Sequence, residues 1–310
     1  MRAFLGYLLA FGRRTSRPAA LVTLFLLAAL ITMNYTVGIE RRILGLGPWY
    51  VVYGCFVAFY AAVIALAWGL QYEWSGSVRP VFSAGLVRLL VIAPLFFAAK
   101  MVHWDFSALL PGSQDSLLNR YWTAVTQLPA KFLLLGVMLW GCWKAGWLEG
   151  NDFMSSVGLT KKGFSARPYF MLLLLLAPLV ALASTQHDFL RVYPKVKSIA
   201  FMNAYPGPVW PWKAGYELSY GIDFLSIELF FRGLLVIGII RYAGEQAILP
   251  MAAFYCTIHF GKPLAECITS FFGGVVLGVL AYRTRSIVGG LIVHLGLAWM
   301  MEVGGWVGHL

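Results

Sequence analysis

The sequence predicts an all-α fold, a polytopic transmembrane helical bundle with about eight to nine membrane segments. Of the 310 residues, 60% are hydrophobic and only 12% are charged. The mean hydropathy is +0.75, and soluble domains use only about 45–50% apolar residues. Long apolar runs also recur along the chain, and a helix needs about 20 such residues to cross roughly 30 Å of hydrocarbon.

Apolar runs place the expected membrane segments in order along the chain. They lie at 19–39, 50–70, 86–103, 132–148, 169–184, 222–242, 247–260, 264–282 and 287–306. The segment 247–260 is short for a membrane span, and the sequence FGKP at 260–263 breaks the chain directly after it. We therefore expect 247–260 and 264–282 to form a bent or re-entrant pair.

The first 18 residues predict an amphipathic helix lying on an anionic leaflet. Apolar residues that share one helical face alternate with arginines. The apolar set is Phe4, Tyr7, Leu8 and Phe11, and the basic set is Arg2, Arg13, Arg14 and Arg17. A cleaved signal peptide is the competing interpretation, but the apolar core is brief and a small-residue cleavage site is missing.

Basic residues predict a cytoplasmic N-terminus, because Lys and Arg are more frequent in cytoplasmic loops. One side of the predicted topology receives Arg13, Arg14, Arg17, Arg79, Lys161, Lys162, Arg167, Arg241, Arg283 and Arg285. The other side receives Arg41, Arg42, Lys195 and Lys197. We expect a multi-pass protein of the bacterial cytoplasmic membrane that binds anionic lipid headgroups. The net charge of +11 is scattered between apolar runs, which does not favour a nucleic-acid partner.

Two polar intervals, 105–127 and 186–213, divide the chain. The second contains the sequence YPGPVWPW at 205–212, whose prolines disfavour a helix and whose tryptophans suit the headgroup level. The expected parts are a basic segment 1–18, N-terminal transmembrane helices 19–185, a Pro/Trp-rich loop 186–215 and a C-terminal core 216–310. The four cysteines, which lack a metal or redox spacing, are expected to be packing residues: Cys55, Cys142, Cys256 and Cys267.

Ionisable residues concentrate in the apolar C-terminal core, where a charge costs about 2.5 kcal/mol or more. They are Asp223, Glu228, Arg232, His259, Glu266, His294 and Glu302. Glu228 and Arg232 stand four residues apart, about 40° around a helix, so we expect them to pair. Such a pair can simply crosslink a bundle. Two histidines and a carboxylate on neighbouring helices can instead hold a water molecule or a divalent metal such as zinc.

Three stretches carry a resemblance to a known family. They are IELFFRG at 227–233, Tyr255 four residues before His259, and Gly273-Gly274 followed by YRTRSIVGGLIVH at 282–294. Together they resemble the CPBP (Abi) intramembrane protease family, which includes the type II CAAX prenyl endopeptidases and has the pattern EExxxR, FxxxH and HxxxN or HxxxD. The resemblance covers roughly residues 217–302. It implies an endopeptidase that cleaves a membrane-associated peptide or protein near or within the membrane.

The resemblance also implies the roles of the site residues. Glu228, His259 and His294 are expected to hold the hydrolytic water, and Arg232 to orient Glu228. The chain departs from the family pattern at three positions: Ile227 replaces the first Glu, Tyr255 the Phe, and Ala298 the Asn or Asp.

An isoleucine neither accepts a proton nor stabilises an oxyanion, and the loss of either group costs orders of magnitude in rate. Asp223, one turn before Ile227, and Glu266 are the candidate compensating carboxylates, ahead of Glu302 at a helix end. Tyr255 packs against His259 and offers a hydroxyl.

Two further hypotheses come from other classes of protein. A family member that has lost catalysis and serves as a membrane scaffold or binding subunit is consistent with Ile227 and Ala298. A transporter is consistent with buried carboxylates and histidines, but it would favour broken helices in matching halves of the chain, whereas the charge here lies in one half.

Overall fold

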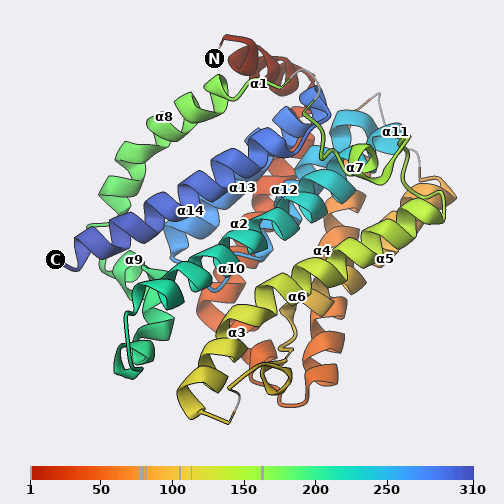
Figure 1. The fold of residues 1–310 in the computed structure, drawn as a ribbon. Coiled ribbons are helices and arrows are strands. Elements are labelled where there is room, and N and C mark those ends of the chain that lie inside the picture. The colour runs from red at the N-terminus through yellow and green to blue at the C-terminus, as the bar shows by residue number, and fades with distance from the viewer. Residues whose placement is uncertain (1, 77–79, 81, 105, 113, 162–163) are drawn as a thin grey trace. The chain divides into compact units, whose positions relative to one another are not determined.

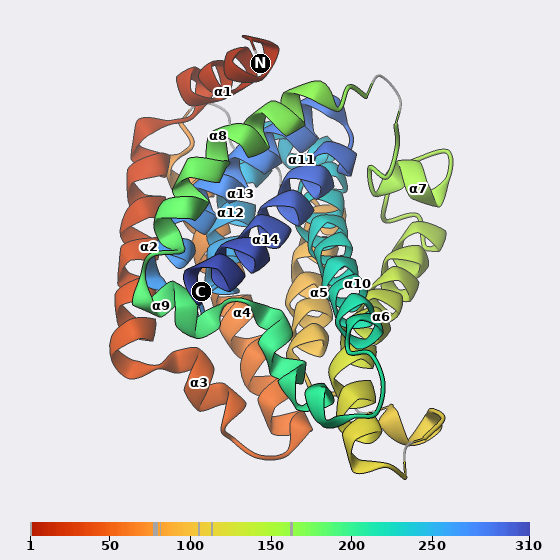
Figure 2. The ribbon, with the colours of Figure 1, turned by 60° about the vertical axis from the view of Figure 1, so that its left-hand side comes forward.

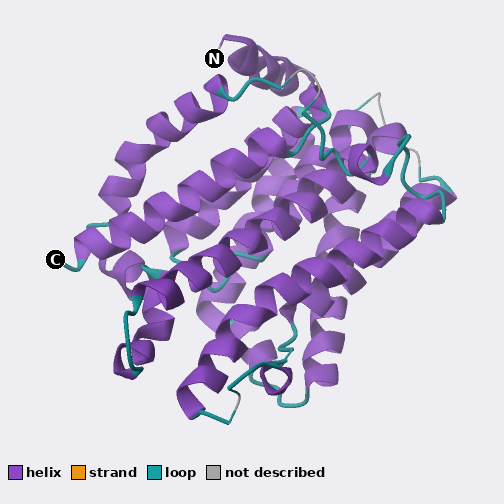
Figure 3. Ribbon diagram, in the orientation of Figure 1, coloured by secondary structure: helices purple, strands orange, loops and turns teal. Residues whose placement is uncertain are grey.

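The structure, a computed structural model, describes residues 2–76, 80, 82–104, 106–112, 114–161 and 164–310. Helices, turns and loops make up this part of the chain, and none of its residues forms a strand (Figure 3). The predicted all-α fold is therefore confirmed. Arg79, Asp105 and Lys162, which entered the topology and loop predictions, lie outside the described residues.

Six helices of the described chain are long and apolar enough to cross a membrane (Figure 1). They are α2 (Arg17–Val37), α4 (Trp49–Trp74), α5 (Ala84–Met101), α6 (Ser116–Lys144), α13 (Leu264–Thr284) and α14 (Val288–Gly308). Helix α8 (Arg167–Ala183) is apolar but shorter. The protein is therefore an integral membrane protein, and the expected count of eight to nine membrane segments is not confirmed.

The N-terminal helix α1 (Arg2–Arg14) forms as predicted and is strongly amphipathic. Phe11 is buried, whereas Leu5 and Leu9 are 56% and 52% exposed. Arg14 lies 3.8 Å from the carboxylate of Glu245. Helix α1 thus keeps both apolar and basic side chains exposed, which suits a helix lying in a membrane interface.

One compact unit comprises Met1–Val102, Met138–Ser165 and Glu228–Gly290. Helix α12 (Ile248–Thr257) is its centre, because all ten of its residues are buried. It packs against α2, α4 and α13 (Figure 2). Its Phe254 ring lies 5.0 Å from the Tyr60 ring of α4 and 5.6 Å from the Phe97 ring of α5. An aromatic core therefore fixes the helix that leads to His259.

Small residues allow α13 to approach α12 closely, because Gly274 and Gly278 stand four residues apart on one face of the helix. A Cβ atom at Gly278 would lie 2.7 Å from the Met251 Cε atom. A Cβ atom at Gly274 would lie 3.1 Å from the Tyr255 ring. Helix α13 therefore supports the Tyr255 side chain directly.

The second compact unit comprises His103–Val137, Ala166–Ile227 and Leu291–Leu310. Its core includes Tyr121 and Val125 of α6 with Ile199 and Met202 of the 3₁₀ segment Lys195–Ala204. Ser219, on α10 (Trp210–Glu228), donates a 2.6 Å hydrogen bond to the Val125 carbonyl.

Small residues also bring α14 against α8 in the second unit (Figure 2). A Cβ atom at Gly296 would lie 2.6 Å from a Leu173 methyl group. A Cβ atom at Gly304 would lie 3.2 Å from the Ser184 Cβ atom. The α14 helix that carries His294 is therefore packed along the α8 surface.

Both polar intervals are more helical than predicted. Helix α6 begins at Ser116 inside the first interval, because the Asp115 carboxylate accepts hydrogen bonds from the Leu117 and Leu118 amides at 2.8 and 3.1 Å. The second interval contains α9 (His187–Val192) and the 3₁₀ segment. Its prolines fall at helix starts or between helices, where a missing amide is tolerated.

Candidate active site

A π-helix follows directly after Glu228. It spans Leu229–Ile237, and the Gly238 amide donates to the Gly233 carbonyl over five residues at 2.8 Å. Residues Leu229–Val236 are all buried. Nothing in the IELFFRG stretch indicates this π-helix, because its residues predict an ordinary α-helix. Such π-helical turns occur frequently at functional sites.

Glu228 and Arg232 form the predicted ion pair. Arg232 Nη1 lies 3.0 Å from Glu228 Oε1, and both side chains are fully buried. Ions of this kind lose several kcal/mol of hydration on burial, and only a close partner of opposite charge compensates that loss. Removal of either Glu228 or Arg232 would therefore leave the other charge buried without a counter-ion.

Contacts continue from Arg232 to His259. The guanidinium carbon lies 4.4 Å from the Tyr255 ring centroid, a cation–π contact. The Tyr255 and His259 rings are 4.7 Å apart at 65°. Nδ1 of His259 lies 3.0 Å from the Tyr255 carbonyl oxygen, which can only accept, so Nδ1 carries the proton and Nε2 is the basic nitrogen. Glu228, Arg232, Tyr255 and His259 thus form one cluster.

His259 lies in a turn, although the expected membrane segment 247–260 includes it. Helix α12 ends at Thr257, and the His259 amide donates to the Cys256 carbonyl at 3.0 Å. The turn continues to Lys262, whose amide donates to the His259 carbonyl at 3.0 Å. The orientation of the imidazole therefore depends on what holds this turn.

Helix α2 holds the turn through two polar residues that sequence reasoning missed. Asn34, 5% exposed, donates a 3.1 Å hydrogen bond to the Phe260 carbonyl. Its Oδ1 atom accepts from the Glu40 amide at 3.1 Å. The Tyr35 hydroxyl donates to the Lys262 carbonyl at 2.6 Å. An Asn within the apolar run 19–39 was the available signal, since an amide in a membrane helix needs a partner.

Charged residues border the same turn. Burial raises the pKa of the Glu40 carboxyl, and the positive charge of Lys262 acts in the opposite direction. Lys262 Nζ lies 3.7 Å from the Glu266 carboxylate. Glu266 occupies the first turn of α13, where the helix dipole favours an acid. These contacts give Glu266 a structural role, and its compensating role in catalysis stays a prediction.

The second unit contains the other predicted site residues. The His294 ring, on α14, lies 4.8 Å from the Phe224 ring of α10 at 65°. The Asp223 carboxylate accepts from the Ser226 hydroxyl at 3.2 Å. Ile227 and Ala298, the two apolar departures from the family pattern, are 7% and 3% exposed.

Glu302 is not at a solvated helix end, as its position suggested. It is 7% exposed, and its two carboxylate oxygens accept from the Lys195 and Val196 amides at 2.7 and 3.1 Å. It therefore caps the start of the 3₁₀ segment. Glu217, which sequence reasoning did not single out, lies beside Glu302 and Trp299.

Cys256 and Cys267 are both fully buried, in line with the predicted packing role. Their sulfur atoms are nevertheless 3.9 Å apart, a proximity that their sequence spacing does not indicate. Within the described part of the chain, no three His, Cys, Asp or Glu side chains are grouped as a metal site requires.

Gly290 leaves space for the Glu228 carboxylate. A Cβ atom at this position would lie 2.6 Å from Glu228 Oε2. We expect Gly290→Ala to displace the carboxylate from Arg232 and to lower the free energy of unfolding by about 1–3 kcal/mol. Gly273→Ala is the matched control, because nothing lies within 4 Å of its added methyl group. Equal thermal stability of the two variants in detergent would contradict the close packing.

These features define an integral membrane protein in which a buried Glu–Arg pair and an imidazole share one polar cluster within apolar helices. Residues 219–300 match the family model described as type II CAAX prenyl endopeptidase Rce1-like. The match includes Glu228, Arg232, Tyr255, His259 and His294, so the resemblance to the CAAX-type protease family is confirmed for this part of the chain. No curated protein and no solved structure matches the chain.

Proposed function

We propose that the protein is an intramembrane endopeptidase that hydrolyses a peptide bond near or within the membrane. The observation that carries this proposal is the fully buried Glu228–Arg232 pair in contact, through Tyr255, with His259. Keeping two charges in an apolar unit is costly. The family match over residues 219–300 supports assigning that cost to proteolysis.

Each side chain has a defined role in this proposal. Arg232 orients the Glu228 carboxylate, which holds and polarises the attacking water, and Nε2 of His259 accepts a proton from that water. The hydroxide adds to the carbonyl carbon, the C–N bond breaks, and the leaving amine takes the proton. Tyr255 fixes the imidazole by ring contact and by its carbonyl. His294 enters through the family pattern. Asp223 and Glu266 are candidates to replace the carboxylate that the family pattern has at the position of Ile227.

The proposed substrate is a membrane-associated peptide or protein. The cleavage assay described below measures whether its hydrolysis requires a prenyl group. We place the protein in the bacterial cytoplasmic membrane with a cytoplasmic N-terminus. Helix α1 would contact anionic headgroups through its arginines and its exposed Leu5 and Leu9. A nucleic-acid partner is not part of the proposal.

A divalent metal such as zinc remains a candidate cofactor from the sequence. The arrangement of the side chains that could ligate a metal gives this cofactor little support. Glu228 pairs with Arg232, and the described residues contain no group of three His, Cys, Asp or Glu side chains. No step above is routed through a metal. We expect activity to survive a zinc chelator; loss of activity on chelation, restored by zinc alone, would show that a metal is required.

Peptide cleavage by the reconstituted full-length protein tests the proposed function. Peptides with a C-terminal CAAX sequence, prenylated and unprenylated, are incubated with nanodiscs and analysed by mass spectrometry. We expect the wild type to cleave and Glu228→Gln to be slower by about 10²–10⁴-fold. Cleavage of neither peptide by folded wild-type protein would overturn the proposal.

The alternative function is a membrane scaffold or binding subunit that has lost catalysis. Ile227 and Ala298, both buried and apolar, favour it. It predicts that folded His259→Ala and His294→Ala variants retain the cellular function. Loss of that function in both variants would count against a scaffold.

Asn34 provides a prediction about positioning. Asn34→Leu removes the donor to Phe260 and the acceptor for Glu40, so the turn that carries His259 loses its support. We expect kcat to fall about 10- to 100-fold, because small misplacements of a reacting group are costly.

Thr23→Val is the control for Asn34→Leu. It also removes a buried polar group from α2, but the Thr23 hydroxyl donates within its own helix, to the Ala19 carbonyl at 2.8 Å, and to no other described segment. An equal fall of kcat in both variants would show that Asn34 has no specific role.

A further inference from the structure

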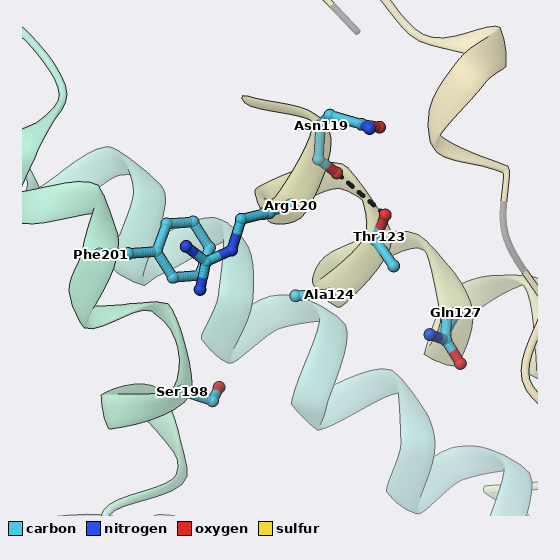
Figure 4. Close-up of a pocket in the computed structure, with 7 residues that line it drawn as sticks. All are labelled: Asn119, Arg120, Thr123, Ala124, Gln127, Ser198 and Phe201. Carbon is cyan, nitrogen blue, oxygen red and sulfur yellow. Dashed lines mark hydrogen bonds between the residues drawn. The ribbon is translucent and has the colours of Figure 1, made fainter. Parts of the chain in front are cut away.

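The second unit contains a polar cleft, and none of the predicted active-site residues lines it. It has a volume of about 320 Å³ and lies between the start of α6 and the 3₁₀ segment Lys195–Ala204 (Figure 4). Small-molecule sites begin at about this size. None of the described residues that line it is acidic.

Arg120 supplies the charge of the cleft. Its guanidinium carbon lies 4.1 Å from the Phe201 ring centroid, so the aromatic face holds the flat cation in place (Figure 4). In the described part of the chain, no Asp or Glu forms an ion pair with it. A guanidinium fixed in this way, with its planar fork of donors available, is suited to phosphate oxygens.

The other polar groups that line the cleft are neutral, and two of them already bond within the protein. The Thr123 hydroxyl donates to the Asn119 carbonyl at 3.0 Å, and Gln127 Nε2 lies 2.7 Å from His103 Nδ1. The cleft is lined by the amides of Asn119 and Gln127 and by the hydroxyls of Thr123 and Ser198. The cleft has one cation, no carboxylate, and neutral donors in the Asn119 amide and the Ser198 hydroxyl. It therefore suits an anion and offers no carboxylate to a choline or ethanolamine group.

The position of the cleft along α6 places it at headgroup level. Helix α6 has 29 residues and is therefore about 44 Å long, whereas the hydrocarbon layer is about 30 Å thick. The excess lies at its polar first turns, which include Arg120. Trp122, whose Nε1 donates to the Pro111 carbonyl at 2.9 Å, and Trp212, 5.0 Å from the Tyr121 ring, form an aromatic group of the kind found at membrane interfaces.

We propose that this cleft binds the phosphodiester of an anionic phospholipid headgroup, with Arg120 as the main contact. The chemistry is that of a phosphate anion, and the length of α6 together with the nearby tryptophans favours a lipid over soluble phosphate as its source. The proposal does not depend on the protein being a peptidase. It differs from the lipid contact proposed for α1, because it is a defined cleft with a fixed guanidinium.

Lipid binding to the full-length protein tests the proposal. Native mass spectrometry in detergent compares short-chain phosphatidylglycerol with short-chain phosphatidylcholine. We expect the wild type to prefer phosphatidylglycerol, and Arg120→Gln to weaken that lipid by about five- to tenfold. Arg120→Lys should retain part of the preference, because it keeps the charge and loses the planar fork.

Arg191→Gln is the matched control, since Arg191 is an exposed arginine of α9 in the same unit that does not line the cleft. Equal weakening by Arg120→Gln and Arg191→Gln, with unchanged thermal stability, would overturn the site. Displacement of phosphatidylglycerol by an equal concentration of inorganic phosphate or glycerol phosphate would overturn the lipid as the occupant.

Discussion

Replacing His259 by alanine is expected to lower kcat for peptide cleavage by about 10²–10⁴-fold, the usual contribution of a general base. The Tyr255 carbonyl fixes the proton on Nδ1, so Nε2 is the nitrogen that accepts the proton of water. Alanine removes this base but keeps the turn, which is held through the Phe260 and Lys262 carbonyls. Steady-state kinetics of the reconstituted protein measure the effect.

His187→Ala is the control for this prediction. His187 is an exposed histidine at the first position of α9, so its loss should leave kcat unchanged. A kcat for His259→Ala within about threefold of the wild type, in a protein of unchanged Tm, would exclude His259 as the base; general-base catalysis contributes far more than that.

Replacing Arg232 by methionine is expected to lower the free energy of unfolding by about 3–5 kcal/mol, because it leaves the Glu228 carboxylate buried without its counter-ion. Methionine fills much of the space of the arginine stem, so the lost charge dominates the effect. The double variant Glu228→Gln/Arg232→Met should recover much of the loss, since no charge then remains buried. Unfolding in detergent, followed by thermal melting, measures the three proteins.

The chain contains an exposed pair for comparison. Arg241 Nη1 lies 2.6 Å from Glu149 Oε1, with the side chains 30% and 66% exposed. Arg241→Met should cost only about 0–1 kcal/mol, because water screens an exposed pair and solvates the remaining carboxylate. Similar losses for Arg232→Met and Arg241→Met would show that burial of the Glu228–Arg232 pair contributes nothing special.

The sequence predicted the all-α membrane fold because the lengths of the apolar runs match the thickness of the hydrocarbon layer. It also predicted the pairing of Glu228 with Arg232, since a spacing of four residues places two side chains on one helical face. Residue spacing does not indicate the π-helix that follows, because no pattern in the buried residues 229–236 distinguishes it from an α-helix.

Contacts between distant segments were the other feature that could not be predicted. Asn34 and Phe260 are 226 positions apart, and nothing in either segment alone indicates that one holds the other. Glu302 was expected at a solvated helix end, whereas it caps a segment more than 100 residues earlier in the chain. Long-range hydrogen bonds of this kind depend on tertiary packing, whereas helical periodicity indicates only which residues of one helix share a face.

The central claim is that Glu228 and His259 activate a water molecule in this membrane protein. Peptide cleavage by nanodisc-embedded protein in ¹⁸O-labelled water, followed by mass spectrometry of the products, tests it most directly. The account predicts one ¹⁸O atom in the new carboxyl terminus with the wild type, and far slower product formation with Glu228→Gln and His259→Ala. An unlabelled product, or cleavage at wild-type rate by both variants, would contradict it.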